Sequence, residues 1–255
     1  MITFFVTDMR PCGPTYQLIY TANELSRRGN VVQVLTFNKK QFPLSESLLC
    51  SRVKVLRFAS FSTFRLFDSN SIVHSQGPIC DSVCFLLSRF FGFAWYSSLR
   101  NVPSEDYPDL FGIFAKPIVW LHLSILRFST VIACSKVVFI KTRKVLPKAN
   151  YVNNSFPFVV KSKIRQIGRS LAYGSTKIRL AFVGSLIPRK NIIDLCRVIE
   201  TFPEAEFHIF GVGSQSDMLS GFSNVTLHGF VTDPWVIAAD MDIFISLSLS
   251  EGLPN

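Results

Sequence analysis

The sequence predicts an α/β protein with two domains, each of which contains a parallel β-sheet. Two observations support this expectation. Short apolar runs bounded by turn residues alternate with stretches of helical periodicity, a pattern typical of parallel sheets covered by helices. The alternation stops between residues 155 and 176, where Pro, Lys, Arg, Ser and Gly accumulate, and then begins again. We therefore expect a first domain over residues 1–154, a linker over 155–176 and a second domain over 177–255.

The composition is that of a folded protein. Of the 255 residues, 48% are hydrophobic and 17% are charged, and 25 are Phe, which excludes intrinsic disorder. The apolar start of the chain meets Asp8 and Arg10 where a secretory signal would continue, so we interpret it as a buried strand. The most apolar later stretches, 83–99 and 114–139, are interrupted by charged residues, and we expect no transmembrane helix.

The net charge of +10 favours an anionic partner. Nucleic acid would satisfy it, but the basic residues are scattered and accompany no nucleic-acid-binding motif, so we expect no nucleic acid. A phosphorylated substrate and the anionic headgroups of a membrane satisfy it equally well. The six Cys form no Cys-x-x-Cys pair, which is typical of reduced thiols in the cytoplasm. Cys80, Cys84 and His74 lack the spacing and the fourth ligand of a structural metal site, so we expect no metal.

The first domain begins with the most regular alternation. Strands are expected at residues 2–6, 31–37, 53–58, 71–74, 93–97, 131–134 and 150–153. The clearest helix covers residues 16–28, because its apolar residues recur on one face and Gly29 follows its last turn.

The second domain repeats the pattern. Strands are expected at residues 178–183, 206–210, 224–227 and 242–247, and helices at 191–201 and 233–241. A parallel sheet needs helices on both faces, yet the sequence ends shortly after the last of these strands. We therefore expect the second domain to be incomplete.

Ligands of parallel α/β sheets bind where strands end and helices begin, because helix N-termini offer free N–H groups and partial positive charge. In the first domain this loop is residues 8–15, where Gly13 permits a close approach of the backbone but equally fits a simple turn. In the second domain, Gly184 and Ser185 follow the first strand, and Arg189 and Lys190 precede the next helix. Cations are unfavourable at a helix start, so a bound diphosphate would stabilise them; a solvated basic surface is the alternative.

Three further loops end at the same edge of the second sheet. Residues 211–213 form a glycine loop that includes Gly213, and Phe230 and Val231 follow the next strand. Glu251, Gly252 and Leu253 come after the last strand, where a carboxylate beside free backbone N–H groups would suit sugar hydroxyls.

The order of these motifs resembles the group 1 (family 4) glycosyltransferases over nearly the whole chain. That resemblance implies the GT-B fold, in which two Rossmann-like domains with parallel sheets face a cleft. The family's Gly-Arg-x4-Lys-Gly segment, which holds the donor diphosphate, corresponds here to Gly184, Ser185, Lys190 and Asn191. Ser185 replaces the usual arginine, and the neighbouring Arg189 is a candidate for supplying that charge. Gly213, Phe230, Val231, Gly252 and Leu253 fall in segments that resemble the family's nucleotide-sugar pocket.

Two positions depart from the family pattern. In the Glu-x7-Glu motif, Glu251 resembles the first carboxylate, whereas the second would fall at position 259, past the 255 residues; we therefore expect a C-terminal truncation. In the first domain, residues 97–101 resemble a loop that carries a histidine near the reacting sugar. Arg100 takes that place, and because a guanidinium stays charged at neutral pH, it would act through charge or hydrogen bonds.

The resemblance implies a retaining glycosyltransferase that uses a nucleoside diphosphate sugar as its donor substrate and needs no cofactor. Lys190, Arg189 and the amides near Gly13 would stabilise the leaving diphosphate, and Glu251 would orient the sugar. The expected acceptor is a lipid-linked saccharide in surface polysaccharide synthesis. The expected location is the cytoplasm, at the inner face of the cytoplasmic membrane, which residues 116–127 would contact unless they form a buried helix. A catalytically inactive remnant and a nucleotide-sugar epimerase of the same architecture are the alternatives.

Overall fold

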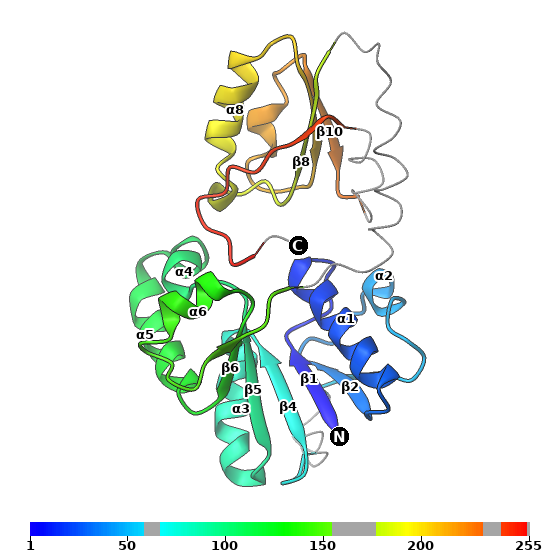
Figure 1. The fold of residues 1–255 in the computed structure, drawn as a ribbon, viewed down its shortest axis with the longest axis vertical. Helices are drawn as coiled ribbons and strands as arrows, with labels where there is room; N and C mark the ends of the chain where they lie inside the picture. The colour runs from blue at the N-terminus through cyan, green and yellow to red at the C-terminus, as the bar shows by residue number, and fades with distance from the viewer. Residues whose placement is uncertain (59–66, 155–176, 232–240, 254–255) are drawn as a thin grey trace. The chain divides into compact units, whose positions relative to one another are not determined.

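A computed structural model describes residues 1–58, 67–154, 177–231 and 241–253 (Figure 1). The chain divides into two compact units, the first comprising Met1–Ser155 with Gly252–Asn255 and the second comprising Phe156–Glu251. Each unit contains its own parallel sheet, which confirms the predicted α/β class. The predicted linker, 155–176, and the predicted helix at 233–241 lie outside the described residues, apart from Met241. Gly252 and Leu253 belong to the first unit although they follow the second in sequence.

The first unit is built on a seven-stranded parallel sheet with the order β3-β2-β1-β4-β5-β6-β7. Its strands are β1 (Ile2–Val6), β2 (Val32–Thr36), β3 (Lys54–Arg57), β4 (Ile72–Gln76), β5 (Ala94–Leu99), β6 (Thr130–Ala133) and β7 (Asn150–Tyr151). The strand order runs one way from β1 to β3 and the other way from β4 to β7. Beside β1 and β4, where this direction changes, consecutive loops diverge and leave room for a ligand.

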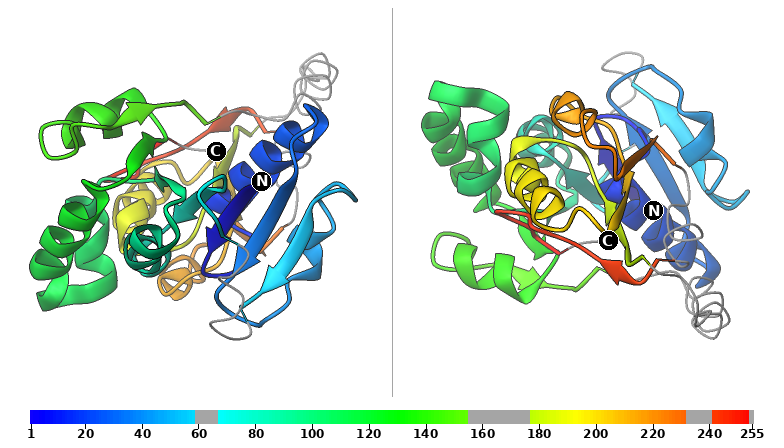
Figure 2. Two further views of the ribbon diagram at one scale, coloured as in Figure 1. Left: turned by 90° about the horizontal axis from the view of Figure 1, so that it is seen from below. Right: turned by 90° about the horizontal axis from the view of Figure 1, so that it is seen from above.

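Helices cover both faces of this sheet (Figure 2). They are α1 (Gly13–Arg27), α2 (Pro43–Glu46), α3 (Pro78–Phe91), α4 (Pro103–Phe111), α5 (Ala115–Leu126) and α6 (Lys136–Thr142), with the 3-10 turn η2 (Gly112–Phe114) between α4 and α5. Helix α1 begins three residues earlier than predicted because Pro14 suits its first turn. It ends where expected, since Gly29 follows with a left-handed φ of 87°.

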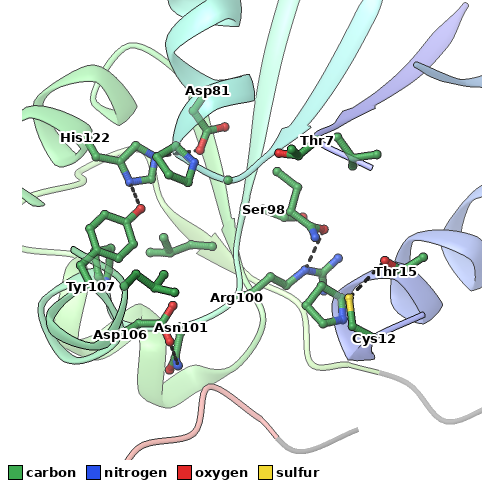
Figure 3. A pocket seen from close by; sticks show the side chains of 18 of the residues that line it. Thr7, Cys12, Thr15, Asp81, Ser98, Arg100, Asn101, Asp106, Tyr107 and His122 are labelled. Carbon is green, nitrogen blue, oxygen red and sulfur yellow. Dashed lines mark hydrogen bonds and ion pairs between the residues drawn. The ribbon is translucent and has the colours of Figure 1, made fainter. Parts of the chain in front are cut away.

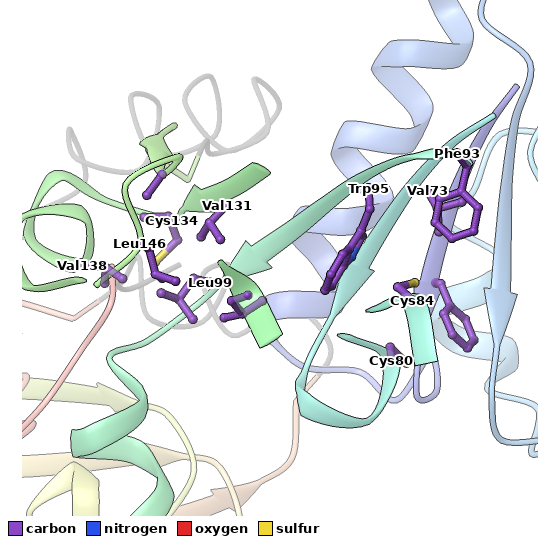
Figure 4. Close-up of a cluster of buried hydrophobic side chains, with 14 of the residues drawn as sticks. Val73, Cys80, Cys84, Phe93, Trp95, Leu99, Val131, Cys134, Val138 and Leu146 are labelled. Carbon is purple, nitrogen blue, oxygen red and sulfur yellow. The ribbon is translucent and has the colours of Figure 1, made fainter. Parts of the chain in front are cut away.

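Alternate side chains of the strands fill two cores. Phe4 and Val6 pack with Ile19 of α1 on one face, whereas Phe5 belongs to the cluster on the other face. The second cluster includes Trp95, Cys80 and Cys84 (Figure 4). All six cysteines are free.

The second unit contains a four-stranded parallel sheet with the order β10-β9-β8-β11. Its elements are β8 (Arg179–Val183), η3 (Pro188–Lys190), α8 (Ile192–Thr201), β9 (Glu206–Phe210), η4 (Ser216–Leu219), β10 (Val225–Gly229) and β11 (Ile243–Phe244). Phe182, Leu195, Phe207 and Ile209 form the centre of its core. The predicted strand at 242–247 is shorter than expected, because only Ile243–Phe244 pairs with β8.

The stretch Pro103–Leu126 differs from the sequence expectation about membranes. By length and composition it could cross a membrane, with a mean hydropathy of 1.4 and only 17% of its most apolar window buried. It is not one continuous helix, however, since Gly112 has a left-handed φ of 51° between α4 and α5. Tyr107 of α4 bonds to His122 of α5, so the two helices pack together as a hairpin.

Candidate functional site

Two groups of polar residues lie at strand ends, one in each unit. In the second unit, the loops that follow β8 and β9 run side by side. Gly184 N–H donates to the Phe210 carbonyl at 2.9 Å, and Leu186 N–H donates to the Val212 carbonyl at 3.0 Å. The predicted glycine loop therefore lies beside the predicted diphosphate segment and is hydrogen-bonded to it.

Close backbone packing explains the two glycines of that loop. A Cβ on Gly211 would lie 1.8 Å from the Gly184 carbonyl oxygen, and a Cβ on Gly213 would lie 2.2 Å from the Leu186 carbonyl oxygen. Neither position can hold a side chain without moving the backbone of the neighbouring loop. Gly213, predicted as a nucleotide-binding residue, thus has a structural requirement of its own.

The structure brings three predicted residues of this unit together. Lys190 Nζ bonds to the Glu251 carboxylate, and Arg189 Nη1 lies 3.7 Å from the same carboxylate. Arg189 also donates to the Ser250 carbonyl at 2.9 Å. About a fifth of each of the three side chains is exposed, so the cluster is accessible but ordered by its surroundings. The two cations therefore lie beside the same carboxylate.

The path of the chain explains this convergence. The cations lie in η3 rather than in α8 itself, and Asn191 then adopts a left-handed φ of 58° before α8 begins. The aliphatic part of Lys190 passes close to Gly184, since a Cβ on Gly184 would lie 3.4 Å from Lys190 Cε. Ser185, in the place of the family's arginine, is exposed in the same loop.

The other predicted residues of this site have different positions. Gly211 N–H donates to the Gly229 carbonyl at 2.8 Å, so Phe230 and Val231 follow a strand end that adjoins the glycine loop. Gly252 and Leu253 instead pack within the first unit. Ser135 Oγ donates to the Gly252 carbonyl at 2.5 Å, and Asn154 Nδ2 donates to the Leu253 carbonyl at 3.3 Å.

In the first unit, a pocket of about 340 Å³ opens at the carboxyl ends of β1, β4 and β5 (Figure 3). Its wall is formed by the loops that follow these strands and by the first turns of α1, α3 and α4. Gly13 is the first residue of α1, between Cys12 and Pro14, which line the pocket. The pocket occupies the place where the strand order changes direction, as expected for a parallel sheet.

Arg100 lines this pocket and is bonded only to amide oxygens among the described residues. Its Nε donates to Gln76 Oε1 at 3.2 Å and its Nη1 donates to Asn154 Oδ1 at 3.1 Å. Burial lowers the pKa of Arg100 from its ordinary value, and only the thiols of Cys134 and Cys12 oppose this shift. The predicted role through charge or hydrogen bonds is compatible with this geometry.

A buried network that the sequence did not predict lines the other side of the pocket. Asp81 accepts hydrogen bonds from Ser75 at 2.5 Å and Ser97 at 2.8 Å, and its second oxygen lies 2.8 Å from His122 Nε2. Tyr107 Oη lies 2.5 Å from His122 Nδ1 (Figure 3). Burial, together with the charge of Asp81, raises the pKa of Tyr107 above its ordinary value.

The sequence contained one signal for this network. His122 lies on the buried side of an apolar helix, where a histidine needs a polar partner. Its partners are Asp81 of α3 and Tyr107 of α4, which the folding of separate helices against α5 brings to it, so the pattern alone could not identify them.

Proteins of known structure share the fold of this chain. HepE of Anabaena matches 97% of this chain and 74% of its own at 16% identity, with a TM-score of 0.73. A TarM variant of S. aureus matches 98% of this chain and 82% of its own at 12% identity, with a TM-score of 0.71. Sucrose-phosphate synthase of Thermosynechococcus elongatus matches 100% of this chain and 77% of its own at 12% identity, with a TM-score of 0.76.

No protein-family model matches the chain, and neither does any curated protein. The likeness to these structures confirms the expected architecture of two Rossmann-like domains with parallel sheets. At 12 to 16% identity, these likenesses show a shared fold.

Proposed function

We propose that this chain is a retaining glycosyltransferase of the group 1 (family 4) type, which transfers a sugar from a nucleoside diphosphate sugar to a lipid-linked saccharide in surface polysaccharide synthesis. The observation that carries the proposal is the cluster of Arg189, Lys190 and Glu251 at the strand ends of the second unit. The ligands bound in two of the structural neighbours support it. HepE was solved with UDP and glucose, and the TarM variant was solved with UDP, fondaparinux and α-GlcNAc-glycerol.

Each residue of the cluster has a role in the proposed reaction. The bond between the anomeric carbon and the diphosphate oxygen breaks, and the acceptor hydroxyl forms the new bond on the same face of the sugar. Negative charge builds up on the leaving diphosphate, where Lys190 and Arg189 are placed to stabilise it. The acceptor proton passes to the departing diphosphate oxygen, so no protein carboxylate has to remove it. Glu251 accepts hydrogen bonds from hydroxyl groups of the donor sugar.

The pocket of the first unit is the proposed acceptor site. Its volume, about 340 Å³, falls within the roughly 300–1,000 Å³ of small-molecule sites. Hydroxyl and amide groups of Thr7, Gln76 and Ser98 line it and offer partners for sugar hydroxyls. Arg100 lies among them.

The α4–α5 hairpin is the proposed contact with the cytoplasmic face of the membrane. Ile113 is 89% exposed, Trp120 71% and Phe114 64%. An exposed apolar face that includes a tryptophan and adjoins the basic residue Lys116 suits the interface of an anionic bilayer. In sedimentation with anionic vesicles, Trp120→Ser combined with Ile113→Ser should reduce the bound fraction several-fold. Equal sedimentation of the variant and the wild type would refute this contact.

The donor site can be tested by nucleotide binding and product analysis. Thermal shift with UDP-, GDP- and ADP-sugars should identify a stabilising donor, and Lys190→Gln combined with Arg189→Gln should abolish the shift. Arg197→Gln is the matched control, because Arg197 is 73% exposed and pairs with Asp194 on the same unit. Undiminished binding in the double variant would contradict the proposal, and so would the absence of any response. Product formed without an acceptor would favour the epimerase instead.

A further inference from the structure

We infer that the pocket of the first unit binds a sugar with an anionic group, a carboxylate or a phosphate, and that Arg100 pairs with that group. This inference rests on the proposed function for the identity of the ligand as a sugar, and it specifies the chemical class of that sugar.

The partners of Arg100 leave its positive charge uncompensated. Gln76 and Asn154 each offer a neutral amide oxygen, and no ion pair joins Arg100 to a carboxylate within the described ranges. Nη2 of the guanidinium makes no hydrogen bond to the described residues. A guanidinium that is removed from water needs an anion or full hydrogen bonding, and two amide oxygens supply only part of this.

The carboxylates that line the same pocket are bound elsewhere. Asp8 is held by Arg10 through bonds of 2.9 and 2.6 Å from Nε and Nη2, and these bonds lower the pKa of Asp8. Asp81 accepts from two serine hydroxyls and contacts His122. Asp106 Oδ1 accepts from Asn101 at 3.2 Å. The pocket therefore has an acidic side near His122 and a cationic side at Arg100.

The electrostatic influence of Arg100 is visible at His74. The pKa of His74 is lowered to about 4, first by burial and then by the charge of Arg100. Among the described residues, His74 Nε2 makes one hydrogen bond, with the hydroxyl of Ser98 at 2.8 Å.

The other polar residues that line the pocket favour a sugar over a free anion. Thr7 and Ser98 present hydroxyl groups, and Gln76 presents an amide whose oxygen already orients Arg100. A planar guanidinium can bind a carboxylate or a phosphate through two parallel hydrogen bonds, which a neutral hydroxyl cannot reproduce. We therefore expect discrimination between charged and neutral sugars of the same size.

The test compares three monosaccharides of equal ring structure on the full chain. Glucuronate, glucose 6-phosphate and glucose are titrated separately, and dissociation constants are measured by ligand-observed NMR. At least one anionic sugar should bind about ten-fold more tightly than glucose. A preference for glucuronate assigns the group as a carboxylate, and a preference for glucose 6-phosphate assigns it as a phosphate.

Substitutions test whether Arg100 causes the preference for anionic sugars. Arg100→Gln should abolish the preference, whereas Arg27→Gln, which removes the same charge from an exposed helix, should retain it. If Arg100→Gln does not fold, Arg100→Lys keeps the charge without the planar fork and should lower the preference several-fold. Equal binding of the three sugars to the wild type would overturn the inference, as would a preference that survives in Arg100→Gln or an absence of binding by all three.

UDP binding is measured in the same samples to separate this inference from the proposed function. Loss of UDP binding with a retained preference for anionic sugars would refute the donor site alone. Retained UDP binding without that preference would refute the role of Arg100 alone.

Discussion

Substitution of Gly211 by alanine should disrupt the site of the second unit through the backbone alone. Its new Cβ would lie 1.8 Å from the carbonyl oxygen of Gly184, whereas real Cβ atoms essentially never approach closer than 3.0 Å. The two loops must therefore separate by about 1 Å. Because Gly184 lies against Lys190, this separation also displaces the cation that is proposed to bind the diphosphate.

The expected destabilisation follows from two contributions. Overpacking against a rigid backbone costs about 1–3 kcal/mol. The φ of 149° at Gly211, which a side chain rarely adopts, costs a further 1–3 kcal/mol or so. Together they lower the free energy of unfolding of this unit by about 2–6 kcal/mol. For a unit of this size, such a loss lowers the melting temperature by on the order of 10 °C or more.

The assay is thermal unfolding followed by circular dichroism, together with UDP titration below the transition. Gly221→Ala is the matched control, because a Cβ there meets no atom within 4 Å. The control should change stability by less than about 0.5 kcal/mol. If Gly211→Ala melts within two or three degrees of this control, the close approach of the two loops is wrong.

Three further changes have expected outcomes. Asp81→Asn removes the buried charge beside His122 and should lower the free energy of unfolding in urea by about 3 kcal/mol; an unchanged midpoint would contradict the network. His74 has a pKa of about 4 in the folded protein, below the ordinary value of 6.5. The folded state therefore favours the neutral imidazole, and the free energy of unfolding decreases as the pH falls from 6.5 toward 4. Urea unfolding at pH 7.5 and 4.5 should show a loss on the order of 2–3 kcal/mol that is smaller in His74→Asn. Glu251→Gln should strengthen UDP binding several-fold in calorimetry, because it frees Lys190, and should weaken the preference for UDP-glucose over UDP; weaker UDP binding would refute the pairing.

The fold could be predicted because it depends on local patterns. Residues 2–6 were predicted as a strand and form β1 with the same limits, since a short apolar run followed by polar turn residues has few other solutions. The limits of α1 depended on Pro14 and Gly29, whose backbone preferences are also local. The hairpin of α4 and α5 was not predicted, because the break at Gly112 interrupts a continuous apolar pattern without changing its composition.

The site could be predicted only where motifs lie close to strand ends. Arg189 and Lys190 follow β8, and Glu251 follows β11, so strand order alone places them at one edge of the sheet. The partners of Asp81 come from β4, β5 and α5, and only the tertiary structure brings them together. It was equally impossible to predict that Arg100 faces amide oxygens and no carboxylate among the described residues, because a sequence shows that a cation is present but not which groups surround it.

The cations of the second unit are already paired with a carboxylate, whereas Arg100 of the first unit is bonded to amide oxygens. This difference indicates how a donor would bind in the proposed reaction. Lys190 is already paired with Glu251, so a diphosphate must take the place of that carboxylate. A diphosphate carries more negative charge than one carboxylate and offers several oxygens, and it can therefore compete for both cations. Its binding would release Glu251 to accept hydrogen bonds from the donor sugar, so phosphate recognition and sugar recognition are coupled through one ion pair. Within the part of the chain that the structure describes, Arg100 pairs with amide oxygens and with no carboxylate, so its charge is available to an anionic group that enters the pocket.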